Sequence, residues 1–438
     1  MSHELRTFGP VDVSQRACLA ISLFVACATA FASNATALPR MSLTAGSPCA
    51  TCHIAQQGGG VRNSIGFGTS QHTGAIPWSK IGINRFDKGA PTWLDDKISL
   101  GMDMRSVLAR MGRPTGTKEK ADLPSMIYVP MQLMPYLGLK PTDWLDVVGS
   151  VNVATVGPIG RSFPGQPSYE VAAQLHSNAS MPTLRVGMIQ PTFGIRHDDH
   201  SMLIRADASS PRRPFIAPNY ADWGGELGYQ PRAWFRIDAG GYLAQNLSKS
   251  VGSSVTDSDI AYSARVMLMP QMIFGGSGDG PPGKDGFDDD DDDDFGEDDE
   301  EEPADDAMSG SLNSWIGASI LGAGDFRTVN AFLGVGASNI GSLMVEAAMV
   351  QKGGNFSALN MMAMASVRLG FEWLYFNVRG EMATAENTAD VQKWETKQLV
   401  AGFEIFPLPY IEIRPEYRIL RTDEYGMNHY TLQFHIAF

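Results

Sequence analysis

Residues 430–438, Tyr430-Thr431-Leu432-Gln433-Phe434-His435-Ile436-Ala437-Phe438, alternate strictly between two kinds of side chain. One face is wholly apolar and mostly aromatic, whereas the other holds Thr431, Gln433, His435 and Ala437. Successive side chains of a β-strand point to opposite faces. A segment of about ten residues with one apolar face is what a lipid-facing barrel with a polar lumen requires. These nine residues therefore predict a barrel strand.

The same alternation recurs from Leu94 onward. In 97–108, one face carries Ile98, Leu100, Met102 and Met104, and the other carries Ser99, Gly101, Asp103 and Arg105. Sixteen strands are expected, at 94–106, 124–136, 144–156, 168–177, 183–195, 221–230, 233–245, 259–270, 312–322, 326–338, 341–351, 357–369, 371–384, 396–406, 409–420 and 429–438. An even number suits a closed antiparallel bacterial barrel. The predicted fold class is all-β: a transmembrane antiparallel β-barrel of about 16 strands over 94–438.

A soluble β-sandwich or propeller is the alternative, because both also alternate at period two. Trp and Tyr near the strand ends favour a membrane barrel. So does Phe438, which resembles the terminal residue by which outer-membrane barrels are recognised for assembly. The expected location is the bacterial outer membrane, with lipid around the barrel.

Loop lengths predict the orientation of the barrel. In its first half, long connections (107–123, 157–167, 196–220) alternate with short ones (137–143, 178–182, 231–232). Short turns are typical of the periplasmic side, so both termini of the chain, and with them the haem segment, are expected on the periplasmic side. By this parity the connection 271–311, which contains the acidic insert 276–309, is periplasmic too. Its aspartate run predicts a solvated, disordered loop, with a cation-concentrating role as the alternative.

Charge patterning excludes one class of partner. Of 438 residues, 43% are hydrophobic and only 19% are charged, and the formal net charge is −14. Sixteen acidic residues lie between Asp285 and Asp306, and leaving them out changes the net charge from −14 to +2. No basic stripe remains that could meet phosphates, so a nucleic-acid partner is not expected.

Residues 1–37 have the pattern of a secretory signal peptide. An uncharged apolar run from Ala17 to Phe31 follows Arg6 and Arg16, and Ala35-Thr36-Ala37 offers a cleavage site. An anchor helix, or lipoprotein cleavage ahead of Cys27, is the alternative. No other stretch approaches the 18 apolar residues of a transmembrane helix candidate.

Residues 38–93 are predicted to form a haem-c segment and linker, because they contain Cys49-Ala50-Thr51-Cys52-His53. Two thiols at this spacing attach covalently to one haem c, and His53 is then its proximal ligand. A disulfide or a zinc site is the alternative, although zinc needs about four ligands and no second cysteine pair follows. Export suits haem c, because attachment occurs outside the cytoplasm.

Further haem contacts are expected in and near this segment. Gly58-Gly59-Gly60 precedes Arg62, which is a possible propionate contact, since a guanidinium matches carboxylate geometry. A flexible linker with a solvated arginine is the alternative. His72 is the predicted distal ligand, with Met41 as the other candidate. Met102 and Met104 lie on the apolar face of the first strand and are expected to face lipid.

The motif C-x-x-C-H, followed by G-G-G-x-R-N, resembles the opening of exported monohaem proteins whose remainder is an outer-membrane barrel. The plan of signal, one haem-c segment and porin-like barrel is similar to that of the fused cytochrome–porins of iron-oxidising bacteria. The resemblance implies an outer-membrane electron conduit. Its partners would be periplasmic cytochromes or other electron carriers, and an extracellular donor or acceptor such as iron.

His197-Asp198-Asp199-His200 is the other polar motif. His197 and His200 could bind a transition metal or face extracellular iron, from a long outer loop after the strand that ends near Ile195. The competing interpretation, which we favour from the sequence, is a polar rim beside Arg196 and Arg205.

Three functions remain open on these observations. The first is an electron-transfer barrel with its haem in or beneath the lumen. The second is a passive porin whose haem-bearing segment is a structural plug. The third is a haem enzyme such as a peroxidase, which is least favoured because no distal His-Arg pair stands near the motif.

Overall fold

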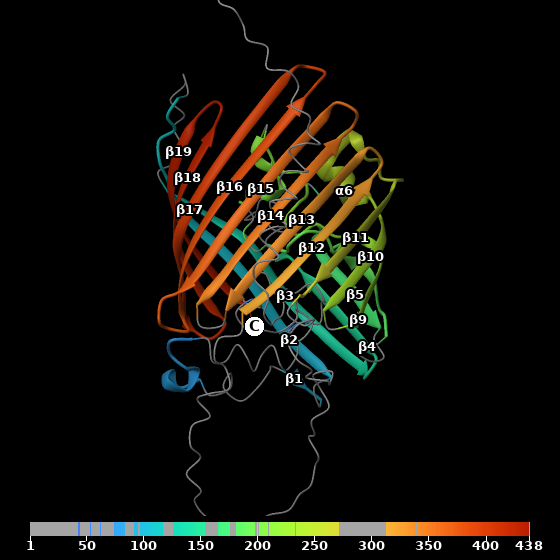
Figure 1. The fold of residues 1–438 in the computed structure, drawn as a ribbon. Coiled ribbons are helices and arrows are strands. Elements are labelled where there is room, and N and C mark those ends of the chain that lie inside the picture. Colours follow the sequence, from blue (N-terminus) through green and yellow to red (C-terminus); the bar gives the residue numbers. More distant parts are fainter. Residues whose placement is uncertain are drawn as a thin grey trace, which may run out of the picture.

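The strands of this chain, with their alternating side chains, form a closed ring (Figure 1). The computed structural model describes residues 43, 53, 62, 74–83, 92–94, 97–116, 126–153, 165–175, 181–197, 199, 201–208, 210–232, 234–270, 312–337 and 340–437. Within them sixteen antiparallel strands form one closed barrel, in which the last strand pairs with the first, Ala437 opposite Asp103. The predicted fold class and strand number are confirmed.

The wall strands follow one another around the ring in chain order. They are β2 (Ile98–Met111), β3 (Ile127–Thr142), β4 (Leu145–Val151), β5 (Tyr169–Leu175), β6 (Thr183–Ile189), β9 (Asp222–Arg232), β10 (Phe235–Leu243), β11 (Ile260–Leu268), β12 (Leu312–Ala323), β13 (Phe326–Ala337), β14 (Gly341–Lys352), β15 (Phe356–Arg368), β16 (Leu374–Asn387), β17 (Gln392–Leu408), β18 (Ile411–Thr422) and β19 (Gly426–Ala437). Each of the sixteen predicted segments overlaps one of them.

Short elements flank or interrupt the wall. β1 (Thr92–Trp93) pairs with the start of β2, and β7 (Ala206–Asp207) pairs with β8 (Ser210–Pro214) between β6 and β9. The helices are η1 (Trp78–Ile81), η2 (Leu203–Arg205), α6 (Gln245–Val251) and η3 (Gly252–Ser254). None of the helices in the described part of the chain is long and apolar enough to cross a membrane.

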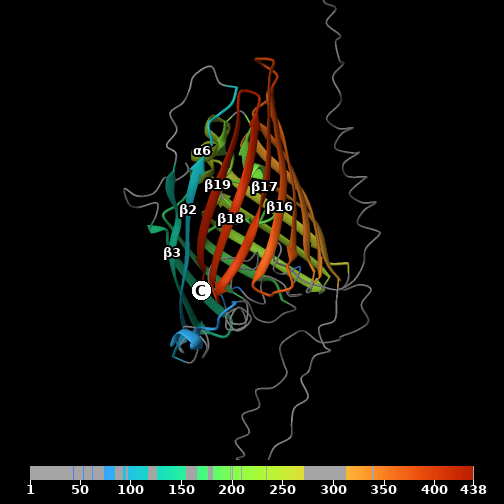
Figure 2. The same cartoon turned by 90° about the vertical axis from the view of Figure 1, so that its left-hand side faces the viewer.

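β2 begins and β19 ends at the same mouth of the barrel, which we call the terminal mouth (Figures 1 and 2). The opposite opening, where α6 joins β10 to β11, is the far mouth. β11 runs towards the terminal mouth and β12 runs away from it, so the connection between them starts and ends at the terminal mouth. The prediction that the connection 271–311 lies at the same mouth as the barrel's first and last strand ends is therefore confirmed. Residues 271–311 themselves lie outside the described ones.

The wall separates two surfaces with different chemistry. On β18, Ile411, Ile413, Tyr417 and Ile419 are partly exposed outward, and the alternate residues Glu412, Arg414, Glu416 and Arg418 are buried inside. On β2, Met102 and Met104 lie on the outer face and Asp103 and Arg105 on the inner face, as predicted. Apolar side chains outside and charged side chains inside are the arrangement of a membrane barrel.

One predicted strand is too long. The segment 183–195 was expected to stay in the wall, but β6 ends at Ile189 and the chain then leaves the sheet. Pro191 has no N–H for a ladder hydrogen bond, and Gly194 adopts φ +55°, a left-handed conformation that suits glycine. Residues 190–221, which we call the inner loop, return to the wall at β9, where Asp222 pairs with Ile189.

The core of the molecule lies inside the barrel rather than between layers. Buried inner-loop residues such as Leu203, Phe215 and Tyr220 pack against α6 and the wall strands in one apolar cluster. A second cluster combines Ile195, Met202 and Ile204 of the loop with residues of β11 to β15. The inner loop therefore fills part of the lumen and narrows it.

Candidate functional site in the barrel lumen

The inner loop is held first by Glu226 of β9. The carboxylate of Glu226 accepts hydrogen bonds from the Thr192 backbone N–H at 2.8 Å and the Thr192 hydroxyl at 2.8 Å. It also accepts from the Tyr242 hydroxyl at 2.7 Å and from Arg185 Nη2 at 3.0 Å. Glu226 thus replaces the ladder partner that the chain loses where it leaves the wall at Gln190.

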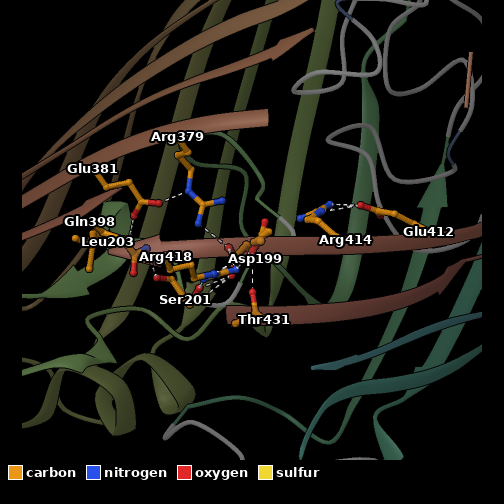
Figure 3. A network of polar contacts seen from close by, with 11 residues as sticks. Asp199, Ser201, Leu203, Arg379, Glu381, Gln398, Glu412, Arg414, Arg418 and Thr431 are labelled. Carbon is orange, nitrogen blue, oxygen red and sulfur yellow. Dashed lines mark hydrogen bonds and ion pairs between the residues drawn. The ribbon is translucent and has the colours of Figure 1, made fainter. Parts of the chain in front are cut away.

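Asp199 joins the inner loop to the opposite wall (Figure 3). Its Oδ2 accepts from Arg379 Nη2 of β16 at 2.7 Å and from Arg418 Nη2 of β18 at 2.9 Å. Its Oδ1 accepts from the backbone N–H and the hydroxyl of Ser201, at 2.9 and 2.6 Å. The three charged side chains are 3–5% exposed, so solvent screens this tether weakly.

The charge state of Asp199 follows from its neighbours. Burial alone raises the pKa of its carboxyl, but Arg418 and Arg379 lower it, and the two hydrogen bonds from Ser201 lower it further. The net pKa lies well below the usual range of an aspartate. In contrast, burial lowers the pKa of Arg205, in η2, to about 10.

Further tethers connect the inner loop to neighbouring strands. Glu346 of β14 accepts from the Ile195 backbone N–H at 3.1 Å and lies 2.8 Å from His197 Nε2. The amide of Asn360, on β15, donates to the Ala206 carbonyl at 2.8 Å, and Glu381 of β16 accepts from the Leu203 N–H. Contacts to β14, β15, β16 and β18 make the loop a fixed constriction near the middle of the barrel.

The lumen wall carries a repeated pairing of an acid with an arginine two residues away on the same strand. Salt bridges of this kind join Asp103 to Arg105, Arg236 to Asp238, Arg379 to Glu381, Glu412 to Arg414, and Glu416 to Arg418. Residues two apart on a strand share a face, so each pair neutralises itself inside the barrel. These pairs were not among the predicted site residues, although they are legible in the sequence as acid-x-Arg or Arg-x-acid within alternating segments.

The N-terminal segment meets the barrel at the terminal mouth. Ala75 N–H donates to the Phe406 carbonyl at 2.9 Å, and Gly74 approaches Pro409 so closely that a Cβ on Gly74 would lie 2.4 Å from its ring. The Arg62 guanidinium lies 5.8 Å from the ring centre of Tyr410, in the β17–β18 turn. These contacts place the segment on the β17–β18 wall.

Leu43 anchors the same segment on a different wall. Its side chain is fully buried, and its carbonyl accepts from the amide of Asn313, on β12, at 2.6 Å. β12 and β18 are six strands apart in the ring of sixteen. The haem motif therefore lies, in sequence, between an anchor on β12 and an anchor on the β17–β18 turn.

Of the predicted haem residues, two are described. His53 is 8% exposed and forms an isolated antiparallel bridge with Arg62. The structure thus places the predicted iron ligand beside the predicted propionate contact. Cys49, Cys52, His72 and Met41 lie outside the described residues, and their roles stay predictions.

The His197 motif lies elsewhere than expected. It was assigned to a long outer loop, but His197 and Asp199 belong to the inner loop and are buried in the lumen. The two side chains are held in the lumen by charged partners, which are Glu346 on β14 for His197, and Arg379 on β16 and Arg418 on β18 for Asp199. His200 lies outside the described residues, so the predicted metal site at His197 and His200 stays a prediction. Among the residues that the structure describes, no group of three or more His, Cys, Asp or Glu could hold a metal ion.

Comparison with known proteins finds similar barrels at low sequence identity. No protein-family model and no curated protein matches the sequence. Similar solved structures include the outer-membrane channel DcaP of Acinetobacter baumannii (TM-score 0.45, 12% identity, 78% of this chain and 97% of that chain). Others are Pseudomonas putida OprB (0.47, 11%, 78% and 95%) and Pseudomonas aeruginosa OpdK with vanillate (0.41, 12%, 79% and 99%).

Proposed function

We propose that this chain forms an outer-membrane channel of the porin type, with the terminal mouth towards the periplasm. The observation that carries this proposal is a closed barrel with an apolar exterior and a lumen lined by paired charges. A barrel needs such a lumen only where water and polar solutes enter it, because a dry interior would favour apolar packing. The inner loop narrows the lumen, so the solutes are small polar molecules or ions.

Fractionation and permeability test this function together. The folded protein is expected in the outer membrane, with migration in gels that changes on heating. Liposomes that contain it should swell in small polar solutes such as amino acids. A soluble periplasmic protein would contradict the location, and impermeable liposomes would contradict the channel.

The second candidate function is electron transfer through a covalent haem c. The observation that favours it is the Cys-Ala-Thr-Cys-His motif, together with the position of His53 and Arg62 beside the terminal mouth. The donor set fits the group: Cys49 and Cys52 would attach it, His53 would bind the iron and Arg62 would contact a propionate. When bound, haem supplies one-electron redox chemistry. The terminal mouth is where a periplasmic cytochrome would dock.

An electron path would then connect this mouth with an extracellular donor or acceptor, such as iron. The apolar core of a bilayer is about 30 Å thick, so one haem at a mouth needs a partner or a redox-active solute inside the lumen. A metal ion bound by His197 and His200 would be one such redox-active solute.

Acid–acetone extraction tests the cofactor independently of the channel. Absorbance should stay with the polypeptide, and Cys49→Ala or Cys52→Ala should abolish attachment. Extractable haem, or none, would contradict haem c. Whole cells separate the conduit from a structural plug, because only a conduit is reversibly reduced and oxidised by an outside donor and acceptor.

A further inference from the structure

The seam of the barrel, where the last strand β19 pairs with the first wall strand β2, carries a buried charge cluster that the proposed channel leaves unexplained. His435 of β19 lies opposite Arg105 of β2 on one side and opposite Glu412 of β18 on the other. The side chains of these residues and of Asp103, also on β2, are only 6–12% exposed. Solvent therefore screens the charges of the cluster weakly.

Each ring nitrogen of His435 faces a carboxylate. Nδ1 lies 3.0 Å from Oε2 of Glu412, and Nε2 lies 3.3 Å from Oδ1 of Asp103. A neutral imidazole has one N–H donor and one acceptor nitrogen, whereas both nitrogens of the cation are donors. A neutral ring would therefore direct a lone pair towards one of the two carboxylates, and only the cation suits both of them.

The second oxygen of each carboxylate is paired with an arginine. Oδ2 of Asp103 lies 3.0 Å from Arg105 Nη2, and Oε1 of Glu412 accepts from Arg414 Nε at 2.7 Å. Nη2 of Arg414 also lies 3.6 Å from Oε1 of Glu404, on β17. The series, which we call the seam chain, runs in the order Arg105, Asp103, His435, Glu412, Arg414 and Glu404. Cations and anions alternate along the seam chain only if His435 carries a positive charge.

Two further groups face the seam chain from other elements. The Tyr136 hydroxyl of β3 faces Asp103, and a phenol is ordinarily neutral at the pH at which an imidazole titrates. Arg196 of the inner loop interacts electrostatically with Asp103 and also with Glu170 of β5. The charge of Arg196 is therefore shared with a carboxylate outside the seam chain, so neither group substitutes for a proton on His435.

We propose that His435 is a proton-binding site at the barrel seam, and that its doubly protonated ring links the first and last wall strands as a pH-sensitive clamp. Asp103 and Glu412 lie on the two strands that flank β19, so deprotonation leaves one of these carboxylates without its cationic partner. A clamp of this kind stabilises the barrel while the ring is protonated, and the stabilisation is lost as pH rises through the titration of the ring. The strand pairing itself remains, so we expect a weaker seam rather than an open barrel. The inference depends on the fold and not on the proposed channel.

Nitrogen-15 NMR of the folded, full-length barrel in detergent micelles tests the charge of His435 directly. The chemical shifts of the two ring nitrogens distinguish a doubly protonated ring from a neutral one, and loss of the signals in His435→Gln assigns them. His435 should be cationic at about pH 7, above the ordinary imidazole value of about 6.5. A neutral His435 ring at this pH overturns the proposal.

His429 provides the matched control. It lies on the same inward face of β19, because an even number of residues separates it from His435, but it is opposite Arg418. Among the described residues, Nδ1 of His429 has no hydrogen-bond partner. The His429 ring should be neutral at about pH 7, and the His435 ring should become neutral there in Asp103→Asn/Glu412→Gln. If heat-modifiable migration shows that the double variant does not fold, Glu412→Gln alone serves the same test. A His435 ring that stays cationic without its carboxylates overturns the proposal.

Urea unfolding then tests the clamp. The urea midpoint of the wild type should fall between about pH 7 and about pH 9, because His435 loses a proton. His429→Gln should show the same fall, and His435→Gln should lose most of it. An equal fall in the wild type and in His435→Gln overturns the proposal.

Discussion

Two neighbouring regions of one lumen have opposite chemistry in this barrel. At the middle of the wall, the charged tether level holds Asp199, Arg379 and Arg418 in buried salt bridges. In the same row, Arg379 pairs with Met364, which belongs to the methionine-rich apolar cluster of the inner loop and β11 to β15. We call this cluster the methionine layer. On β14 only one residue separates Met344 from Glu346, and both point inward. The difference teaches that facing the lumen does not by itself decide whether a side chain is polar. The groups that pack against the side chain inside the lumen decide it.

The largest expected effect is at the tether. Asp199→Ala leaves two buried guanidinium groups without their shared carboxylate, and removing one partner of a buried ion pair costs about 3–5 kcal/mol of unfolding free energy. Ser201→Ala, which removes only a neutral hydroxyl partner of Asp199, should cost about 1 kcal/mol. Urea unfolding of the reconstituted barrel, followed by heat-modifiable migration, measures both. Equal stability of the two variants would show that the Asp199 carboxylate contributes no more than a neutral hydrogen-bond partner.

A medium effect is expected in the methionine layer. Gly334→Ala places a Cβ against the Trp315 ring, and overpacking of this kind typically costs about 1–3 kcal/mol. Gly380, also within a wall strand, has no heavy atom within 4 Å of its added Cβ. Gly380→Ala should therefore leave the urea midpoint almost unchanged. A layer that is loosely packed would show the same small effect at both glycines.

The smallest expected effect is that of pH, between 7 and 5, on the stability that Asp199 contributes. The folded pKa of Asp199 lies below its unfolded value of about 3.9. Such a group contributes its full stability above the unfolded pKa and loses it only as pH falls through the folded pKa. The stability difference between wild type and Asp199→Asn should thus be equal at pH 7 and pH 5, and shrink only below about pH 4. A difference that shrinks between pH 7 and pH 5 would show that the two arginines do not hold the carboxylate ionised.

The sequence predicts the wall of this protein better than its interior. Alternation is a local property, so the sixteen strands, the outward side of Met102 and the parity of the acidic insert follow from short segments. The course of the inner loop depends on partners far away in sequence, since Asp199 pairs with Arg379 and Arg418. Residues 190–195 remain apolar enough to continue β6, and only Pro191 and Gly194 hint that the chain turns inward.

The candidate site is likewise predictable from the sequence only where its residues lie close together in the chain. The haem motif is visible because its chemistry needs adjacent residues, and His53 and Arg62 are neighbours in space as well. The methionine layer is invisible in the sequence, because its members come from five strands, the inner loop and Leu43. The acid-and-arginine pairs on the strands can also be read from the sequence, because their members lie only two residues apart.

The most direct test of the account is single-channel conductance in planar lipid bilayers, compared between wild type and a barrel without its constriction. Ile189 and Asp222 are paired residues of neighbouring strands, so residues 190–221 can be replaced by a short Asn-Gly turn that closes a regular hairpin. The wild type should show discrete conductance steps, and the shortened protein should show steps that are several-fold larger. Absence of steps from both proteins, although both fold as heat-modifiable barrels, would contradict a channel, and equal steps would contradict the inner loop as its constriction.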